Sequence, residues 1–116
     1  MKPSLLFIVA SDPRTSARPA EAVRIAAGVG AWQKAEVHLY LRGAAVLALS
    51  EFADELIDED NFTRYLPMLR HGDQRLWVQK GNPLLADLGQ PALPFEEIDD
   101  AQLARRCAAS SHVLRF

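Results

Sequence analysis

The stretch LLFIVA, residues 5–10, constrains the fold of this chain more than any other feature, because every position in it is apolar. A strand with one solvated face alternates apolar and polar residues, whereas a strand covered by helices on both faces is apolar throughout. The run is far shorter than the ~20 residues that span a bilayer, and shorter than the apolar core of a secretory signal. It therefore predicts a buried strand in a protein with no membrane segment.

Further along, strand-like and helix-like segments alternate. Segment 19–32 carries apolar residues on two helical stripes, so we expect a helix covered on two sides, by the sheet and by a partner subunit. Alternating strands and helices predict one α/β domain over 1–116, a three-layer sandwich with a mainly parallel sheet of about five strands. The other expected strands are 36–43, 75–79, an edge strand within 91–98 and 112–116, and the other expected helices are 44–52, about 61–69 and about 99–109.

Helix boundaries are marked by specific residues. Asp60 or Asn61 is expected to cap the helix that follows it, and Pro67 to kink or loosen that helix. Asp99 and Gln102 stand at the spacing of a capping box for the last helix.

Charge limits the class of partner. The formal net charge is −2, with no excess of Lys and Arg to neutralise phosphates, so we expect no nucleic-acid binding. Segment 51–60 carries six carboxylates, which indicates a solvated face, with an acidic docking patch as the alternative.

The single cysteine, Cys107, excludes an internal disulfide and a cysteine-based zinc site, and is typical of a reducing, cytoplasmic environment. It follows Leu103 by four residues, beside Ala104 and Ala108, on what we expect to be the core face of the last helix. A buried cysteine is chemically inert, whereas a reactive one needs exposure and positive neighbours. We expect the inert case.

The three histidines do not form a metal-binding pattern. His38 lies within a strand, His71 precedes Gly72 at the end of a helix, and His112 opens the last strand. No pair has the i, i+4 spacing of a helical metal site, so structural roles and no metal are expected.

The loop after the first strand is a candidate anion site. It offers hydroxyls and guanidiniums in front of a helix N-terminus, a combination that favours anions. Neither a P-loop nor a dinucleotide motif is present, so no nucleotide cofactor is expected. Loop hydroxyls also stabilise turns without any ligand, and that alternative stays open. The candidate residues are Ser11, Arg14, Thr15, Ser16 and Arg18.

The loop after the third expected strand completes the candidate site. In a parallel sheet, ligands gather where strands end and helices begin. The chain offers Gln79, Lys80, Gly81 and Asn82 there, which include no nucleophile with a base beside it, so no catalytic residue is assigned. Gln79, Lys80 and Asn82 are instead expected to face the same edge as the first loop.

Taken together, these segments resemble the DsrE/DsrF-like family, which includes the TusD-type sulfur-relay subunits. The resemblance rests on four stretches: SDPRTSARPAEAVRIA after the first strand, EVHLYLRGAAVLAL, HGDQRLWVQKGNPLLADLG, and AQLARRCAASSHVLRF at the end. It implies an α/β sandwich that assembles into dimers, trimers or hexamers, often with related subunits.

The resemblance also implies a site for sulfur. Family members carry it as a persulfide on a cysteine at the end of the third strand, which corresponds to about Gln79 here. No thiol stands at residues 79–82. We therefore expect a non-catalytic homo-oligomeric subunit, or a partner of a DsrE-family paralogue. The alternative is a small-ligand or anion-binding module that uses the loops after the first and third strands.

Overall fold

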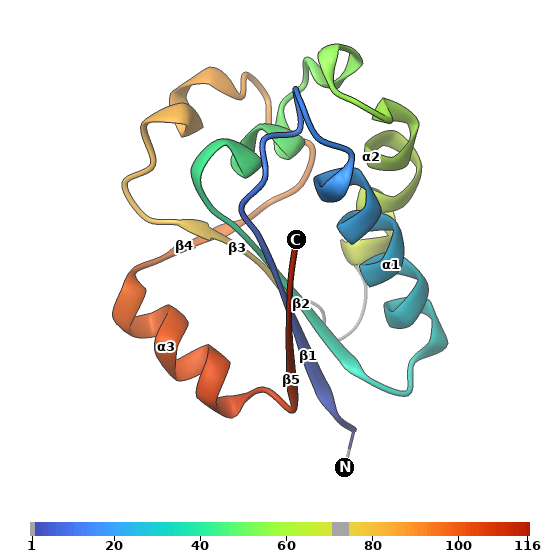
Figure 1. The fold of residues 1–116 in the computed structure, drawn as a ribbon, viewed down its shortest axis with the longest axis vertical. Coiled ribbons are helices and arrows are strands. Elements are labelled where there is room, and N and C mark those ends of the chain that lie inside the picture. Colours follow the sequence, from blue (N-terminus) through green and yellow to red (C-terminus); the bar gives the residue numbers. More distant parts are fainter. Residues whose placement is uncertain (1, 71–74) are drawn as a thin grey trace.

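The computed structural model describes residues 2–70 and 75–116, and within them five parallel strands form one sheet in the order β4-β3-β2-β1-β5 (Figure 1). Each neighbouring pair is parallel, which confirms the expected sheet type. The strands are β1 (Ser4–Val9), β2 (Glu36–Leu41), β3 (Arg75–Gln79), β4 (Glu96–Ile98) and β5 (His112–Arg115).

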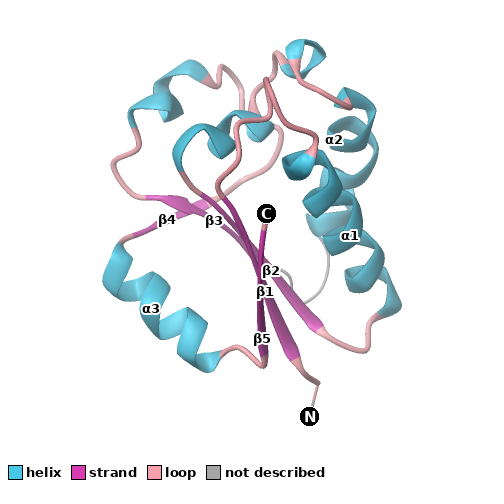
Figure 2. Ribbon diagram, in the orientation of Figure 1, coloured by secondary structure: helices cyan, strands magenta, loops and turns pink. Residues whose placement is uncertain are grey.

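Helices cover both faces of the sheet, as Figure 2 shows. From β1 to β4 the chain steps toward one edge, and α1 and α2 lie on one face. It then returns to the far side of β1 through α3, which lies on the opposite face. Reversing direction changes the covered face because parallel crossovers are right-handed. The helices are α1 (Arg18–Trp32), α2 (Glu59–Tyr65) and α3 (Asp100–Ala109), with short 3-10 helices η1 (Gly43–Leu49), η2 (Ala53–Glu55), η3 (Leu66–Arg70) and η4 (Pro83–Asp87).

The main core lies between the sheet and the α1–α2 layer. Strand residues that face this layer are apolar, including Phe7, Leu39 and Val78, each almost fully buried. The second core, under α3, is much smaller and centres on Tyr40, Trp77 and Leu103. The three-layer expectation is confirmed, with one thick and one thin helical layer.

The second apolar stripe of α1 is covered mostly by its own chain, so the partner contact expected there stays a prediction for its exposed end. Ala22 is fully buried, and Ile25 and Val29 pack against the main core. The cover comes from α2 and η3, both of which contact α1. Trp32, at the end of the stripe, is 66% exposed.

The start of α2 also differs from the prediction. The helix begins at Glu59, one residue before the expected cap, and Asp58 precedes it with φ +55 and no capping side chain. Asn61 instead donates a hydrogen bond to the Ala20 carbonyl at 3.3 Å, which ties α2 to α1. Pro67 acts as predicted, because the α-helix ends at Tyr65 and continues as η3. The expected stop at His71 and Gly72 lies outside the described residues.

The capping box of α3 is confirmed. The backbone N–H of Gln102 donates to Asp99 Oδ1, and the backbone N–H of Asp99 donates to Gln102 Oε1, each at 2.8 Å. In place of the expected helix 44–52 the chain forms the shorter η1, which ends at Leu49. It begins at Gly43, where φ +56 turns the chain after β2 ends at Leu41.

Candidate functional site

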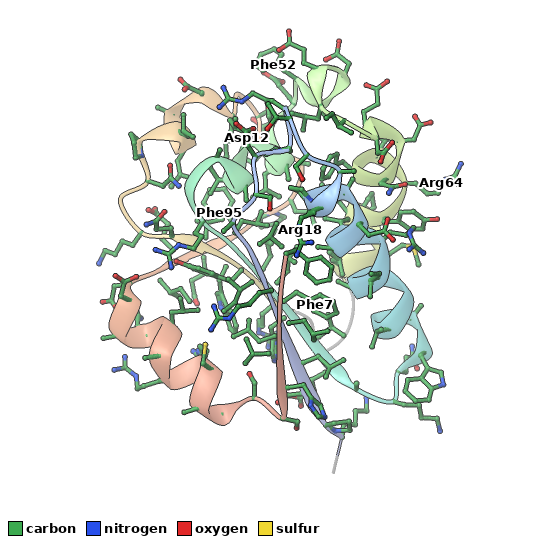
Figure 3. The ribbon with its side chains drawn as sticks, in the orientation of Figure 1. Phe7, Asp12, Arg18, Phe52, Arg64 and Phe95 are labelled. Atoms are coloured by element: carbon green, nitrogen blue, oxygen red, sulfur yellow. The ribbon has the colours of Figure 1, made fainter. Side chains whose placement is uncertain are left out.

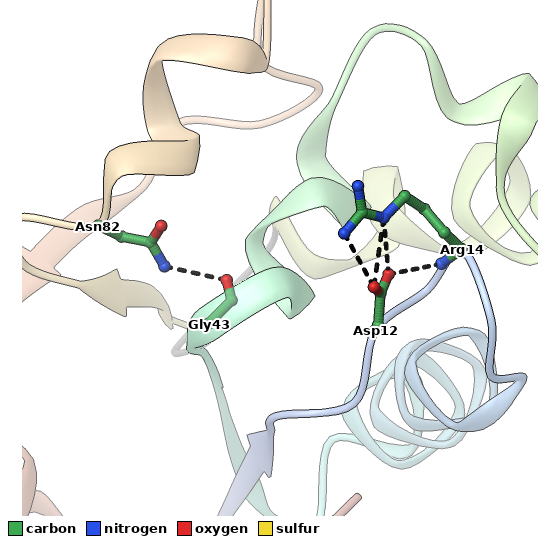
Figure 4. A network of polar contacts seen from close by, with 4 residues as sticks. All are labelled: Asp12, Arg14, Gly43 and Asn82. Atoms are coloured by element: carbon green, nitrogen blue, oxygen red, sulfur yellow. Dashed lines mark hydrogen bonds and ion pairs between the residues drawn. The ribbon is translucent and has the colours of Figure 1, made fainter.

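The two loops proposed as a site do open on the same edge of the sheet, at the carboxyl ends of β1 and β3. They are not adjacent, because β2 and η1 lie between them. Figure 4 shows the Asp12–Arg14 pair apart from the contact between Gly43 and Asn82. The structure therefore places two separate clusters where the sequence predicted one.

In the first loop, Arg14 is paired within the loop. Its guanidinium donates to both carboxylate oxygens of Asp12 at 2.9–3.2 Å, and its backbone N–H donates to Asp12 Oδ1 at 2.9 Å. These bonds lower the pKa of Asp12 below its usual value, mainly through the side-chain contact with Arg14. This guanidinium already has a carboxylate, so an added anion would compete with Asp12.

Arg18 contacts the end of the chain. Its Nη2 donates to the Arg115 carbonyl at 3.1 Å, and its guanidinium lies 5.8 Å from the centre of the Phe116 ring. Figure 3 shows Arg18 near Phe7, on which Phe116 stacks with ring centres 5.8 Å apart. The strand order reverses between β1 and β5, where open α/β sheets usually bind ligands, and here the chain's own last residues fill that position.

The hydroxyls of this loop have local roles or face outward. Ser16 Oγ accepts from the Arg18 N–H at 3.1 Å, as in a hydroxyl-stabilised turn. Thr15 is exposed and Ser11 is half-buried. The contact of Ser16 agrees with the reading of loop hydroxyls as turn-stabilising groups.

The loop after β3 is built around an amide cluster. Gln79 Oε1 accepts from the Gly43 N–H at 2.9 Å, and Asn82 Nδ2 donates to the Gly43 carbonyl at 2.9 Å. Asn82 Oδ1 also accepts from the Leu84 N–H at 2.9 Å, which caps η4. Lys80 is exposed beside this cluster. Gln79 and Asn82 thus fasten the end of β3 to the start of η1.

Cys107 is only half-buried, which corrects part of the prediction for α3. It packs at the border of the smaller core, as expected, but Ala104 and Ala108 on the predicted core face are exposed. The smaller core under α3 is narrow, and Leu103 is the residue of α3 that is buried in it.

The histidines do not form a metal site in the described part of the chain, where no group of three possible ligands converges. His38 packs its ring against Trp77 with ring centres 5.0 Å apart, and His112 is exposed. His71 lies outside the described residues. No helix in residues 2–70 and 75–116 has the length and apolar character to cross a membrane.

The sequence reading missed a cavity of about 410 Å³ on the α3 side of the sheet. It lies over the first halves of the strands, where α3 leaves the sheet uncovered. The residues on its floor alternate along the strands, and the residues above it come from the end of α3. Among its lining residues are Glu36, His38, Arg75, Trp77, Arg106 and Ser110.

A signal for this cavity exists in the sequence EVHLYL of β2. Glu36, His38 and Tyr40 alternate with Val37, Leu39 and Leu41, so one face of the central strand is polar at its start. A strand covered equally on both faces would be apolar throughout. The alternation therefore indicates a sheet face that is not fully covered by helices.

Comparison with known proteins supports the fold and nothing finer. No family model matches the chain, and no curated protein matches it in sequence. Among solved structures, the crystal structure of the ychN protein from E. coli matches over 100% of both chains with a TM-score of 0.80 and 17% identity. At this identity the likeness concerns architecture alone, and it shows that the chain has a DsrE-like α/β fold.

Proposed function

We propose that this protein is a non-catalytic DsrE-like subunit of an oligomer associated with intracellular sulfur relay. The observation that carries the proposal is the position of Gln79. In the family that the sequence resembles, a cysteine near this position holds sulfur as a persulfide. Here the side chain is an amide whose oxygen accepts from the Gly43 N–H, so it serves the backbone of the neighbouring loop.

The cysteine elsewhere in the chain does not replace it. Cys107 lies in the last turn of α3 and packs against the smaller core, away from the carboxyl edge where β3 ends. Sulfur transfer requires an accessible thiolate, and partial burial against apolar residues limits access to this thiol. The non-catalytic assignment follows from these two positions together.

Assembly is supported by Trp32. The indole of Trp32, at the end of α1, is 66% exposed, so most of its apolar surface is not packed against its own chain. Large aromatic side chains are enriched at the centres of protein interfaces, where their burial contributes most. We therefore place the subunit contact around the end of α1.

Sulfur transfer can be tested directly by intact-mass spectrometry after incubation with a persulfide donor. The native protein should gain no sulfur. A stoichiometric gain on native protein that disappears in Cys107→Ser would contradict the non-catalytic assignment.

The converse variant is Gln79→Cys. The introduced thiol at the end of β3 should label with iodoacetamide faster than Cys107, because Lys80 follows it and a nearby cation favours the thiolate. Circular dichroism checks that the variant is folded. Slower labelling than Cys107 would show that residue 79 does not correspond to the family position.

Assembly is measured by light scattering at micromolar concentration, where a mass above the 12.9 kDa of one chain is expected. Trp32→Glu should reduce that mass without unfolding the protein, since the side chain is mostly exposed. Ala86→Glu, an exposed position on η4, is the matched control and should leave the mass unchanged. A monomeric wild-type protein would refute the oligomer.

The alternative, an anion-binding module at the loops after β1 and β3, stays a prediction. The subunit role is favoured over it because both arginines of the first loop already have partners. Arg14 pairs with Asp12, and Arg18 contacts Arg115 and Phe116. Sulfate binding that weakens in Lys80→Ala would favour it.

A further inference from the structure

The cavity on the α3 side of the sheet carries charged side chains of both signs, which sets it apart from the apolar face under α1 and α2. Its floor is formed by the starts of β1, β2 and β3, with Ser4 paired to Glu36 and His38 paired to Arg75 in the register. Its volume of about 410 Å³ falls within the usual range for small-molecule sites.

One part of the cavity is rich in guanidinium groups. The Arg106 guanidinium of α3 lies 5.0 Å from the centre of the Trp77 ring, and His38 contacts the same ring from the neighbouring strand. Arg75, two residues before Trp77, also lines the cavity. The aromatic contact holds the Arg106 guanidinium over the sheet, and guanidiniums pair with carboxylates through two parallel hydrogen bonds.

The other part favours a cation. Glu36 lies at the first position of β2, with its carboxylate 3.8 Å from His38 Nε2. The last turn of α3 ends above it at Ala109 and Ser110, both of which line the cavity. The carboxyl end of a helix carries partial negative charge, which adds to that of Glu36.

We propose that this cavity binds a small zwitterion of the free α-amino-acid class. The ligand's carboxylate pairs with Arg106, and its ammonium lies between Glu36 and the end of α3. A purely anionic ligand would meet Glu36 and Glu96, and a purely cationic one would meet the Arg106 guanidinium. This inference is independent of the subunit role proposed above.

The chain provides its own reporter. It contains two tryptophans, Trp77 in the cavity and Trp32 at the exposed end of α1. In Trp32→Phe the fluorescence comes from Trp77 alone, and we expect a saturable change on titration with free proteinogenic amino acids such as L-alanine or L-glutamine. In Trp77→Phe, where Trp32 is the fluorophore, the same titration should give no change.

Ligand analogues test the class. For an amino acid that binds, the N-acetyl derivative lacks the ammonium and the amide derivative lacks the carboxylate. Each should bind at least about tenfold more weakly, because each leaves one charged end of the cavity without its partner. Equal binding of all three forms would overturn the zwitterion assignment.

Matched variants locate the site. In the Trp32→Phe background, Arg106→Gln should weaken binding by about tenfold or more, through loss of the charged pair. Arg105→Gln, the neighbouring exposed position that does not line the cavity, should leave binding unchanged. Glu36→Gln should remove the preference for the amino acid over its N-acetyl form, with Glu55→Gln as the control.

Two results would overturn the proposal. One is the absence of any saturable Trp77 signal, confirmed by calorimetry, with every free amino acid at millimolar concentration. The other is a Trp77 emission that depends on protein concentration and on no ligand, which would assign this face to a contact between subunits. Neither result bears on the persulfide test, so failure of this inference is distinguishable from failure of the subunit role.

Discussion

Gln79 at the end of β3 accepts a hydrogen bond from the backbone N–H of Gly43 at 2.9 Å, across 36 positions of sequence. Gly43 has φ +56, a conformation that favours glycine, in the turn that follows β2. Asn82 donates to the carbonyl of the same glycine. Side chains from the end of β3 and from the loop after it therefore bind both backbone polar groups of Gly43. Two amide side chains thereby connect the end of β3 to the start of η1 at the carboxyl edge of the sheet.

We expect Asn82→Ala to destabilise the protein by about 1 kcal/mol, because it leaves the Gly43 carbonyl and the start of η4 without their hydrogen-bond partners. Asn82 itself is 7% exposed. Lys80→Ala, two residues earlier and exposed, should change the free energy of unfolding by less than about 0.5 kcal/mol. Urea unfolding measures both variants, and equal effects would contradict a structural role for the amide cluster.

Tyr40→Phe should leave stability unchanged or raise it by about 1 kcal/mol. Among the described residues, the Tyr40 hydroxyl is buried with no hydrogen-bond partner, and removing such a group while keeping the ring relieves its desolvation cost. Thermal unfolding is the measurement, with the half-buried Tyr65→Phe as control. A loss of more than about 1 kcal/mol would show that the hydroxyl has a partner in solution.

The same residue predicts a response to alkaline pH. Burial raises the pKa of Tyr40 above its usual value of 10.0. The unfolded chain then loses this proton at a lower pH than the folded protein does. The contribution of Tyr40 to stability is therefore constant below about pH 10 and falls as pH rises through the higher pKa of the folded protein. The alkaline fall should be smaller in Tyr40→Phe than in the wild type.

Removing the capping box with Asp99→Ala should cost about 0.5–2 kcal/mol, because the Gln102 N–H loses its acceptor at the start of α3. The neighbouring Asp100→Ala changes charge in the same turn without removing the cap, so it should cost clearly less. Helix content by circular dichroism and unfolding by urea distinguish the two variants. Equal losses would mean that charge, and not the cap, stabilises the start of α3.

The first loop has an acid-side signature. The pKa of the Asp12 carboxyl should lie below 3.8, because its ionised form accepts hydrogen bonds from Arg14. A lowered pKa means that the contribution of this pair is present above about pH 4 and is lost as pH falls through the folded value. An NMR titration should show the pKa rising in Arg14→Ala and staying low in Arg18→Ala. No rise in Arg14→Ala would disprove the pairing in solution.

The sequence was sufficient for those parts of the fold that depend on local pattern. The apolar run of β1, the Pro67 break and the Asp99–Gln102 box each act over a few residues, and each agrees with the structure. The start of α2 was mispredicted because Asn61 bonds to Ala20, a tertiary contact that no local rule contains. The cover over the second stripe of α1 was missed for the same reason.

The candidate site shows the same division. Strand ends could be placed from sequence, so Gln79 and Arg14 were expected at one edge, but their partners depend on which loops meet in space. Predicting the cavity under α3 requires two facts that the sequence of one strand does not contain. Polar positions of β2 and β3 align in register, and α3 ends above them.

The position of β5 has a consequence for how the chain folds. β1 is the second strand of the sheet, and its outer neighbour is the last strand of the chain, fastened by Phe116 N–H to the Ile8 carbonyl and Ala10 N–H to the Phe116 carbonyl. The residues of β1 and β5 that pair are about 100 positions apart in sequence, so closing this edge of the sheet carries a large loop-closure entropy. Until β5 pairs, one edge of the apolar strand β1 presents unpaired backbone N–H and C=O groups, so a variant that weakens β5 exposes an edge that can pair with another chain.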